Sequence, residues 1–239
     1  PGLFIPAIEE DGHISELDFY VLKKVWQFIN ERYEKNKFVV PVSVNLSWMD
    51  FYDEAMMETI IKEIDGFKDT GHKIDEKAFH PKNILEAFNK KLGSKNTTVV
   101  TDVGQHQMWT AQYFNFKTPR TLISSGGLGT MGFGMGASIG AQVANPKAVV
   151  FNIAGDGSFG MDCNEFATAV NFKIPVKVIV MNNNALGMVR QWQSLFYEGR
   201  YAETTLNRAT DFVKLAEAFG GTGFRVEKPE ELQEVLEKA

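Results

Sequence analysis

Residues 148–160 read AVVFNIAGDGSFG, and this stretch decides the fold. Its first seven residues are apolar or β-branched apart from one asparagine, as expected for a buried strand at 148–154. Gly155 and Gly157 then flank Asp156, and glycines let the backbone approach a ligand closely. We therefore predict a buried strand, a ligand-binding turn and a helix at 160–171.

The same alternation extends in both directions, from residue 82 to the C-terminus. The other predicted strands are 97–101, 121–125, 176–182 and 222–226, and the other predicted helices are 82–92, 105–114, 131–144, 187–196, 210–219 and 229 onward. Short apolar strands separated by helices are typical of an α/β fold with a doubly wound, mostly parallel sheet. Ligands of such sheets bind beyond the carboxyl ends of the strands.

Oxygen ligands and free amides follow two of these strands. Asp156 supplies a hard oxygen that suits Mg²⁺ or Ca²⁺, and Asn183 supplies a neutral oxygen from another loop that follows a strand. A helix beginning near Ser158 would offer amides to a phosphate. Taken singly, Gly-Asp-Gly is more often a tight turn. The pairing of the two loops favours a metal and diphosphate site.

Three long motifs resemble a known enzyme family. They are TDVGQHQMW at 101–109, SSGGLGTMGFGMGASIGAQVANP at 124–146, and GDGSFGMDCNEFATAVNFKIPVKVIVMNNNALGMVRQWQSLFYEGRYAET at 155–204. About 160 residues resemble the diphosphate-binding domain of thiamine-diphosphate (ThDP) enzymes, specifically the acetolactate (acetohydroxyacid) synthase catalytic subunit. The resemblance implies a transferase that makes 2-acetolactate and CO₂ from two pyruvates, for branched-chain amino-acid biosynthesis.

The resemblance also implies residue roles. The metal ligands would be Asp156, Asn183 and the Ala185 carbonyl; the cofactor-binding residues Gln105, His106, Gly129, Met131, Gly155, Gly157, Ser158 and Asn183; the catalytic residues Met131 and Gly129; and the substrate-pocket residues Met188, Val189 and Trp192. Met131 would hold ThDP bent, and the Gly129 carbonyl would accept a hydrogen bond from its aminopyrimidine. Without the resemblance, Met131 and Trp192 would be read as packing residues, and His106 as an ordinary surface or core histidine.

Composition restricts the partners. The net charge is −5 with scattered basic residues, which argues against a nucleic-acid surface. No apolar run is long enough to span a membrane, and the single Cys163 fits a reducing compartment, so we expect a cytoplasmic location. The resemblance implies small 2-keto acids as substrates, ThDP and Mg²⁺ as cofactors, FAD in the full-length family, a homo-oligomer and a regulatory subunit.

Residues 1–65 differ from the remainder. A helix capped by Ser15, a strand at 38–46 and a second helix from Asp53 are predicted there. The motifs PGLFIPAIEEDGHISELDFYVLKKVWQFIN and VVPVSVNLSWMDFYDEAMMETIIKEI resemble part of an EAL domain, the cyclic-di-GMP phosphodiesterase barrel. In that family a metal ligand corresponds to Asn45, although the EAL glutamate is absent.

These observations predict an EAL-like fragment at 1–65, a linker at 66–80, and a ThDP diphosphate-binding domain at 81–239 that stops before its last strand. A pyrimidine-binding domain with its glutamate and an FAD domain are not found in the sequence. We therefore expect a partial catalytic subunit with little activity alone. The alternatives are a cyclic-di-GMP-related module and a non-functional chimera.

Overall fold

The computed structural model describes residues 4–35, 44, 46–47, 55, 58–59, 62, 79–92 and 96–238 of the 239-residue chain. The chain divides into two compact units, Pro1–Lys73 and Ile74–Ala239. None of the helices in the described part of the chain combines the length and apolar character that crossing a membrane requires.

The first unit contains α1 (Ile5–Glu10) and α2 (Ile14–Glu34). Because α2 begins at Ile14, Ser15 lies inside the helix and the prediction that it caps the helix is wrong. Asn45 and nearly all of the predicted strand fall outside the described residues. The predicted linker lies outside them too, apart from its last two residues, so the domain boundaries stay predictions.

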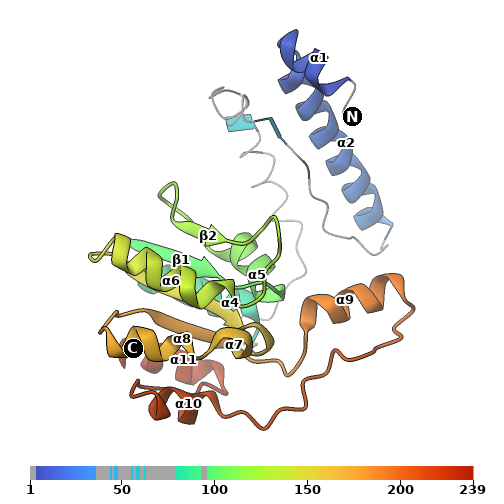
Figure 1. The fold of residues 1–239 in the computed structure, drawn as a ribbon. Helices are drawn as coiled ribbons and strands as arrows, with labels where there is room; N and C mark the ends of the chain where they lie inside the picture. The colour runs from blue at the N-terminus through green and yellow to red at the C-terminus, as the bar shows by residue number, and fades with distance from the viewer. Residues whose placement is uncertain are drawn as a thin grey trace. The chain divides into compact units, whose positions relative to one another are not determined.

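The second unit is built on a four-stranded parallel sheet (Figure 1). Its strands are β1 (Thr97–Thr101), β2 (Leu122–Ser124), β3 (Val149–Gly155) and β4 (Lys177–Met181). They lie in the order β2-β1-β3-β4. The chain leaves β1 for β2 on one side and then crosses back to β3 on the other. The order therefore reverses between β1 and β3, and ligands of doubly wound sheets bind beyond the strand ends at this point.

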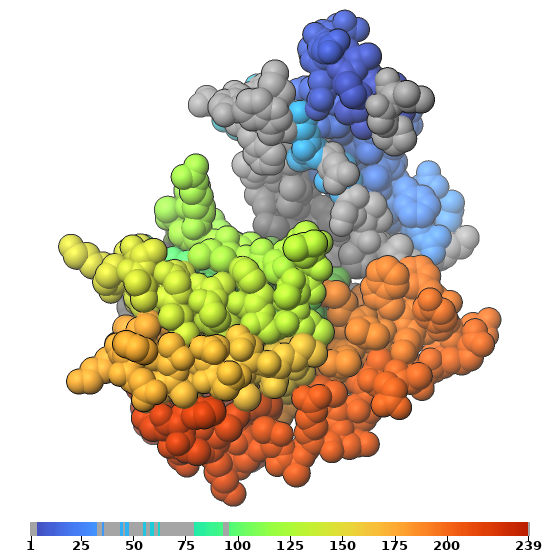
Figure 2. Space-filling view, viewed as in Figure 1, coloured from blue at the N-terminus to red at the C-terminus, as the bar shows by residue number. Residues whose placement is uncertain are grey.

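Helices cover both faces of the sheet, which confirms the predicted doubly wound α/β fold. The helices described in this unit are α4 (Pro81–Leu92), α5 (Gln105–Tyr113), α6 (Phe133–Ala144), α7 (Asp156–Asp162), α8 (Glu165–Asn171), α9 (Gly187–Phe196), α10 (Phe212–Ala218) and α11 (Pro229–Lys238). Apolar clusters place α4, α5 and α11 on one face and α6, α7, α8 and α10 on the other. Figure 2 shows α6 in yellow and α8 in orange at the surface.

Neighbouring valines of β1 show why both faces must be covered. Val99 is buried against Leu85 of α4, while Val100 is buried on the opposite face, where Phe133 of α6 packs. Successive strand residues point to opposite faces, so two buried neighbours require a layer of helices on each side.

The predicted helix at 160–171 is wrong in its start and its continuity. It is two helices, and the first begins at Asp156, directly after β3. The Ser158 hydroxyl accepts a hydrogen bond from the Gly155 amide at 3.1 Å, which caps this early start. The predicted helix at 131–144 similarly begins only at Phe133, so Met131 precedes it.

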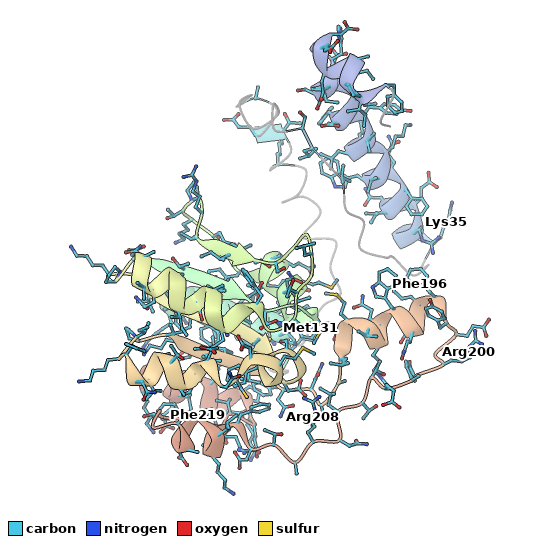
Figure 3. The ribbon with its side chains drawn as sticks, in the orientation of Figure 1. Lys35, Met131, Phe196, Arg200, Arg208 and Phe219 are labelled. Atoms are coloured by element: carbon cyan, nitrogen blue, oxygen red, sulfur yellow. The ribbon has the colours of Figure 1, made fainter. Side chains whose placement is uncertain are left out.

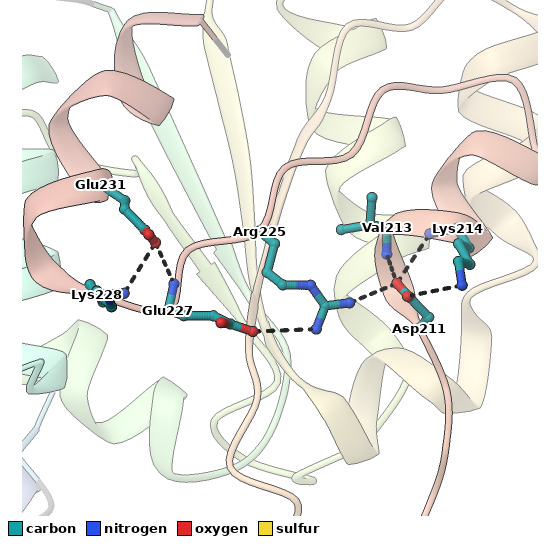
Figure 4. A network of polar contacts seen from close by, with 7 residues as sticks. All are labelled: Asp211, Val213, Lys214, Arg225, Glu227, Lys228 and Glu231. Carbon is teal, nitrogen blue, oxygen red and sulfur yellow. Dashed lines mark hydrogen bonds and ion pairs between the residues drawn. The ribbon is translucent and has the colours of Figure 1, made fainter.

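The predicted strand at 222–226 is absent, because this segment pairs with no strand among the described residues. Side chains hold it instead (Figure 4). Arg225 forms an ion pair with Asp211 at 2.9 Å, and Asp211 also accepts hydrogen bonds from the first amides of α10. Glu231 accepts from the amides of Glu227 and Lys228. Side-chain hydrogen bonds and ion pairs thus hold this segment in place of the expected strand pairing.

Candidate functional site

A cavity of about 290 Å³ opens beyond the carboxyl ends of β1, β3 and β4. It lies where the strand order reverses, as expected for a doubly wound sheet. Every predicted site residue except Trp192 lines it: Gln105, His106, Gly129, Met131, Gly155, Asp156, Gly157, Ser158, Asn183, Ala185, Met188 and Val189. The loops that bring them together follow different strands.

Asp156 is the most unusual polar group in the cavity. Its side chain is only 6% exposed, and Oδ1 has no hydrogen-bond partner among the described residues. Burial raises the pKa of this carboxyl above its usual value, against hydrogen bonds from nearby main-chain groups that lower it. A buried carboxylate oxygen without a partner is costly. A hard cation at this position would remove that cost.

The loop that carries Asp156 meets the loop that carries Asn183. Gly155 and Met181 are register partners in β3 and β4, so both loops leave the same edge of the sheet. A Cβ on Gly157 would lie 2.6 Å from a Leu186 methyl group, which shows how closely the loops approach. The two predicted metal-binding side chains therefore line one cavity. The Asn183 side-chain oxygen accepts from the Ala185 amide at 3.0 Å.

Gln105 at the start of α5 reaches the same loop. A Cβ on Gly187 would lie 2.2 Å from Gln105 Oε1 and 3.1 Å from Asn183 Nδ2, so a larger residue there would require the Gln105 side chain to move. Gln105 Nε2 also donates to Gln191 of α9 at 3.0 Å. Gln191 was not predicted from the sequence, because only the fold brings these two helices together.

His106 is 5% exposed, and its Nε2 has no partner among the described residues. Burial lowers its pKa from 6.5 to about 4, although the charge of Asp102 and a main-chain hydrogen bond raise it. The ring is therefore neutral at pH 7. It lies against Gly155, whose Cβ position is 3.0 Å from Nδ1. A neutral imidazole here can donate one hydrogen bond but adds no positive charge.

Met131 sits on the turn that leads into α6 and lies near α7 (Figure 3). Its terminal methyl is 3.9 Å from the Cβ position of Gly157. The turn depends on Asp102, which accepts hydrogen bonds from the amides of Gly132 at 2.9 Å and Gly134 at 3.1 Å. Sequence reasoning missed Asp102, although its place directly after a buried strand was a usable signal.

The first turn of α9 forms the apolar wall of the cavity. Met188 and Val189 line it, whereas Trp192 is 59% exposed and packs against Phe196 at 5.3 Å between ring centroids. Sequence reasoning also missed further apolar lining: Val103, Trp109, Met181 and Leu186. Met181 ends a strand, Val103 and Leu186 follow strands, and Trp109 lies on α5, so only the fold shows that they form one wall.

The cavity therefore has two chemically different parts. One holds Asp156, Asn183 and main-chain amides, and the other is lined by methionine, valine, leucine and tryptophan side chains. No group of three or more His, Cys, Asp or Glu residues is positioned to hold a metal within the part of the chain that the structure describes. A metal here would need main-chain or ligand oxygens as well. The arrangement suits an elongated molecule with an anionic end and an apolar body.

Comparisons with known proteins identify a family and several relatives. The family described as "Thiamine pyrophosphate enzyme, C-terminal TPP binding domain" matches residues 102–239. The acetolactate synthase catalytic subunit of Aspergillus candidus is 51% identical over 159 residues, covering 66% of this chain and 23% of that protein. The probable acetolactate synthase large subunit of Methanococcus aeolicus is 51% identical over 158 residues, covering 66% and 26%.

A third relative aligns over a longer range. The mitochondrial acetolactate synthase of Schizosaccharomyces pombe is 46% identical over 246 aligned positions, covering all of this chain and 36% of that protein. None of these relatives is an EAL-domain protein, and the expected EAL resemblance is not shown. The chain spans between 23% and 36% of the length of the three relatives.

Proposed function

The chain belongs to the thiamine pyrophosphate enzymes through their C-terminal TPP binding domain, and from this premise we propose that its cavity binds the diphosphate of ThDP through Mg²⁺. The observation that carries the proposal is the buried, unpartnered Asp156 oxygen at the entry to α7. Mg²⁺ prefers carboxylate and carbonyl oxygens together with phosphate oxygens. The residues present fit this ion and this anion.

In this proposal Asp156, Asn183 and the Ala185 carbonyl hold the metal. Gln105 and His106 donate side-chain hydrogen bonds to the diphosphate. The Ser158 hydroxyl already donates to the Gly155 carbonyl at 3.3 Å, so Ser158 and Gly157 contribute main-chain amides. His106 is held neutral by burial and acts as a donor rather than a counter-charge.

The apolar wall orients the rest of the bound molecule and excludes water. Met131 supports the cofactor body from the α6 side, and the Gly129 carbonyl accepts from its aminopyrimidine. Met188 and Val189 border the substrate, while Trp192 on the next turn of α9 favours a second keto acid larger than pyruvate. When bound, ThDP supplies an electron sink for decarboxylating a 2-keto acid.

The whole-protein activity that we propose is an acetolactate synthase reaction, in which two pyruvates give 2-acetolactate and CO₂. The names of the relatives, among them a catalytic and a large subunit, support this choice and a regulatory partner. FAD, a homo-oligomer and a role in branched-chain amino-acid biosynthesis are part of the same proposal. The cytoplasmic location stays a prediction, since some of these relatives are named mitochondrial.

The experiment is calorimetric titration of the full 239-residue chain with ThDP, once with excess Mg²⁺ and once with a chelator. We expect binding that requires Mg²⁺ and that weakens about 100-fold in Asp156→Asn. Glu217→Gln, an exposed carboxylate on α10 that does not line the cavity, is the matched control and should bind like wild type. Equal affinity with chelator, or wild-type affinity in Asp156→Asn, would overturn the metal site.

A further inference from the structure

The turn that carries Gly129 and Met131 has few anchors on its exposed side. Leu128 before it is 93% exposed. The Gly129 amide donates to the Ser125 carbonyl at 2.9 Å, and the Thr130 amide donates to the Ser125 hydroxyl at 3.1 Å. These two bonds hold the turn only to its own beginning. Its position relative to the cavity must come from elsewhere.

Asp102 holds the turn in its position beside the cavity. It follows β1 directly, is 1% exposed, and does not line the cavity. Its Oδ1 accepts from the Val103 amide at 2.7 Å and the Gly132 amide at 2.9 Å, and its Oδ2 accepts from the Gly134 amide at 3.1 Å. Hydrogen bonds to a buried charged acceptor are stronger than neutral ones. One carboxylate thus ties the turn to the centre of the sheet.

Two glycines allow this close approach. Gly132 has a φ of +91°, a conformation that side chains other than glycine rarely adopt. A Cβ on Gly134 would lie 3.0 Å from Asp102 Oδ2 and 2.5 Å from Asn152 Oδ1. The backbone therefore rests directly on buried polar side chains of β3 and the loop after β1.

The opposite side of the turn faces α7. The Cβ position of Gly132 is 3.5 Å from the Cβ atoms of Met161 and Asp162. Met131, next to Gly132, reaches the Gly157 position at 3.9 Å. The turn is therefore held between Asp102 and α7, and its residues border the cavity.

We propose that Asp102 is a positioning residue, which fixes the Gly129–Gly134 turn so that Met131 and the Gly129 carbonyl meet the body of the cofactor. This inference rests on the proposed function. It separates two tasks within one cavity. The loops after β3 and β4, together with Gln105 and His106 of α5, bind the diphosphate, and the Asp102 side chain sets the contact with the rest of the molecule through the turn.

The test compares two probes in the full chain, Mg²⁺ with ThDP and Mg²⁺ with inorganic pyrophosphate. Asp102→Asn keeps the side-chain volume but replaces one acceptor oxygen with an amide that cannot accept from a main-chain N–H. We expect its affinity for Mg²⁺·ThDP to fall about tenfold, because the turn loses charge-assisted hydrogen bonds. Its affinity for Mg²⁺·pyrophosphate should equal that of wild type.

The control for reduced stability is Phe88→Leu, which thins an apolar cluster on α4 away from the cavity. Its affinities for both probes should match wild type. Equal losses for both probes in Asp102→Asn, or no loss for ThDP, would overturn the positioning role. If wild type binds neither probe with Mg²⁺, the proposed function itself fails, and this result is distinct from the others.

Hydrogen exchange on the wild-type chain tests the contact without any variant. The Gly132 and Gly134 amides should exchange slowly, since both donate to the buried Asp102 carboxylate. Mg²⁺·ThDP should slow them further, whereas Mg²⁺·pyrophosphate should leave them unchanged. Exchange of both amides as fast as that of the exposed Leu128 amide would contradict the proposal.

Discussion

The loops after β1 and β3 each place a buried aspartate at the end of a central strand, yet the two carboxylates differ. Asp102 accepts three main-chain hydrogen bonds, while Asp156 Oδ1 has no partner among the described residues. A saturated carboxylate holds the fold together. An unsaturated one bordering a cavity keeps its capacity for a ligand. The same residue type therefore serves structure at one strand end, and in our proposal it binds the metal at the next.

The largest expected effect comes from removing the saturated carboxylate. Asp102→Ala should lower the free energy of unfolding by about 4 kcal/mol, because three amides lose their acceptor and two of them belong to the Gly129–Gly134 turn. Urea denaturation followed by circular dichroism measures this loss. A loss below about 1 kcal/mol would mean that the hydrogen bonds of Asp102 do not stabilise the fold as we infer.

The second effect concerns His106, which lies between the two loops. Its pKa falls from 6.5 in the unfolded chain to about 4 in the folded one, so the unfolded state binds more protons between these values. The free energy of unfolding should therefore have its full value above pH 6.5, where the ring is neutral in both states. It should fall by about 3 kcal/mol as the pH drops towards 4. Urea denaturation at a series of pH values measures it. His106→Gln should flatten this dependence, and an unchanged slope would contradict a buried neutral ring.

A smaller effect compares two glycines of α6. Gly134→Ala should lower the free energy of unfolding by about 2 kcal/mol, because the new Cβ would collide with the Asn152 and Asp102 side chains. Gly136→Ala, one half-turn later, meets open space and should raise it by about 0.5–1 kcal/mol. Thermal and urea denaturation of both variants checks the pair. Equal effects would show that the turn does not rest closely on Asp102.

The smallest effect is an increase in the free energy of unfolding rather than a loss. Asp156→Asn removes a carboxylate whose pKa is raised by burial, so the metal-free chain should gain less than about 1 kcal/mol of stability at pH 7. Adding Mg²⁺ and ThDP should then stabilise wild type but not the variant, because only a ligand that binds the folded state raises its melting temperature. Thermal melts with and without the ligands measure both parts. A variant that melts below wild type without ligands would contradict an unsatisfied Asp156.

Much of the fold could be predicted from residue patterns. Val99, Val100 and the run at 149–154 are short apolar stretches between helical segments, and they form the parallel strands as predicted. The pattern failed where local polar contacts decide the structure. At 222–226 the Arg225–Asp211 ion pair and three nearby glycines replace a ladder, and Ser158 starts α7 earlier than the apolar periodicity indicates.

The site shows a similar division. Asp156 and Asn183 could be proposed because both follow apolar strands, and the register of β3 and β4 brings their loops together. Asp102 also follows an apolar strand, but the sequence does not show that amides of a later turn are its partners, and Gln191 could not be assigned because its partner lies on another helix. Trp192 was predicted as a pocket residue, but it lies on the exposed side of α9 and its substrate role stays a prediction.

A crystal structure of the full chain grown with Mg²⁺ and ThDP tests the central claim most directly. We predict metal density about 2.1 Å from an Asp156 carboxylate oxygen, the Asn183 side-chain oxygen and the Ala185 carbonyl, with the diphosphate completing the coordination. Diphosphate density elsewhere on the chain, or a metal that Asp156 does not contact, would contradict it.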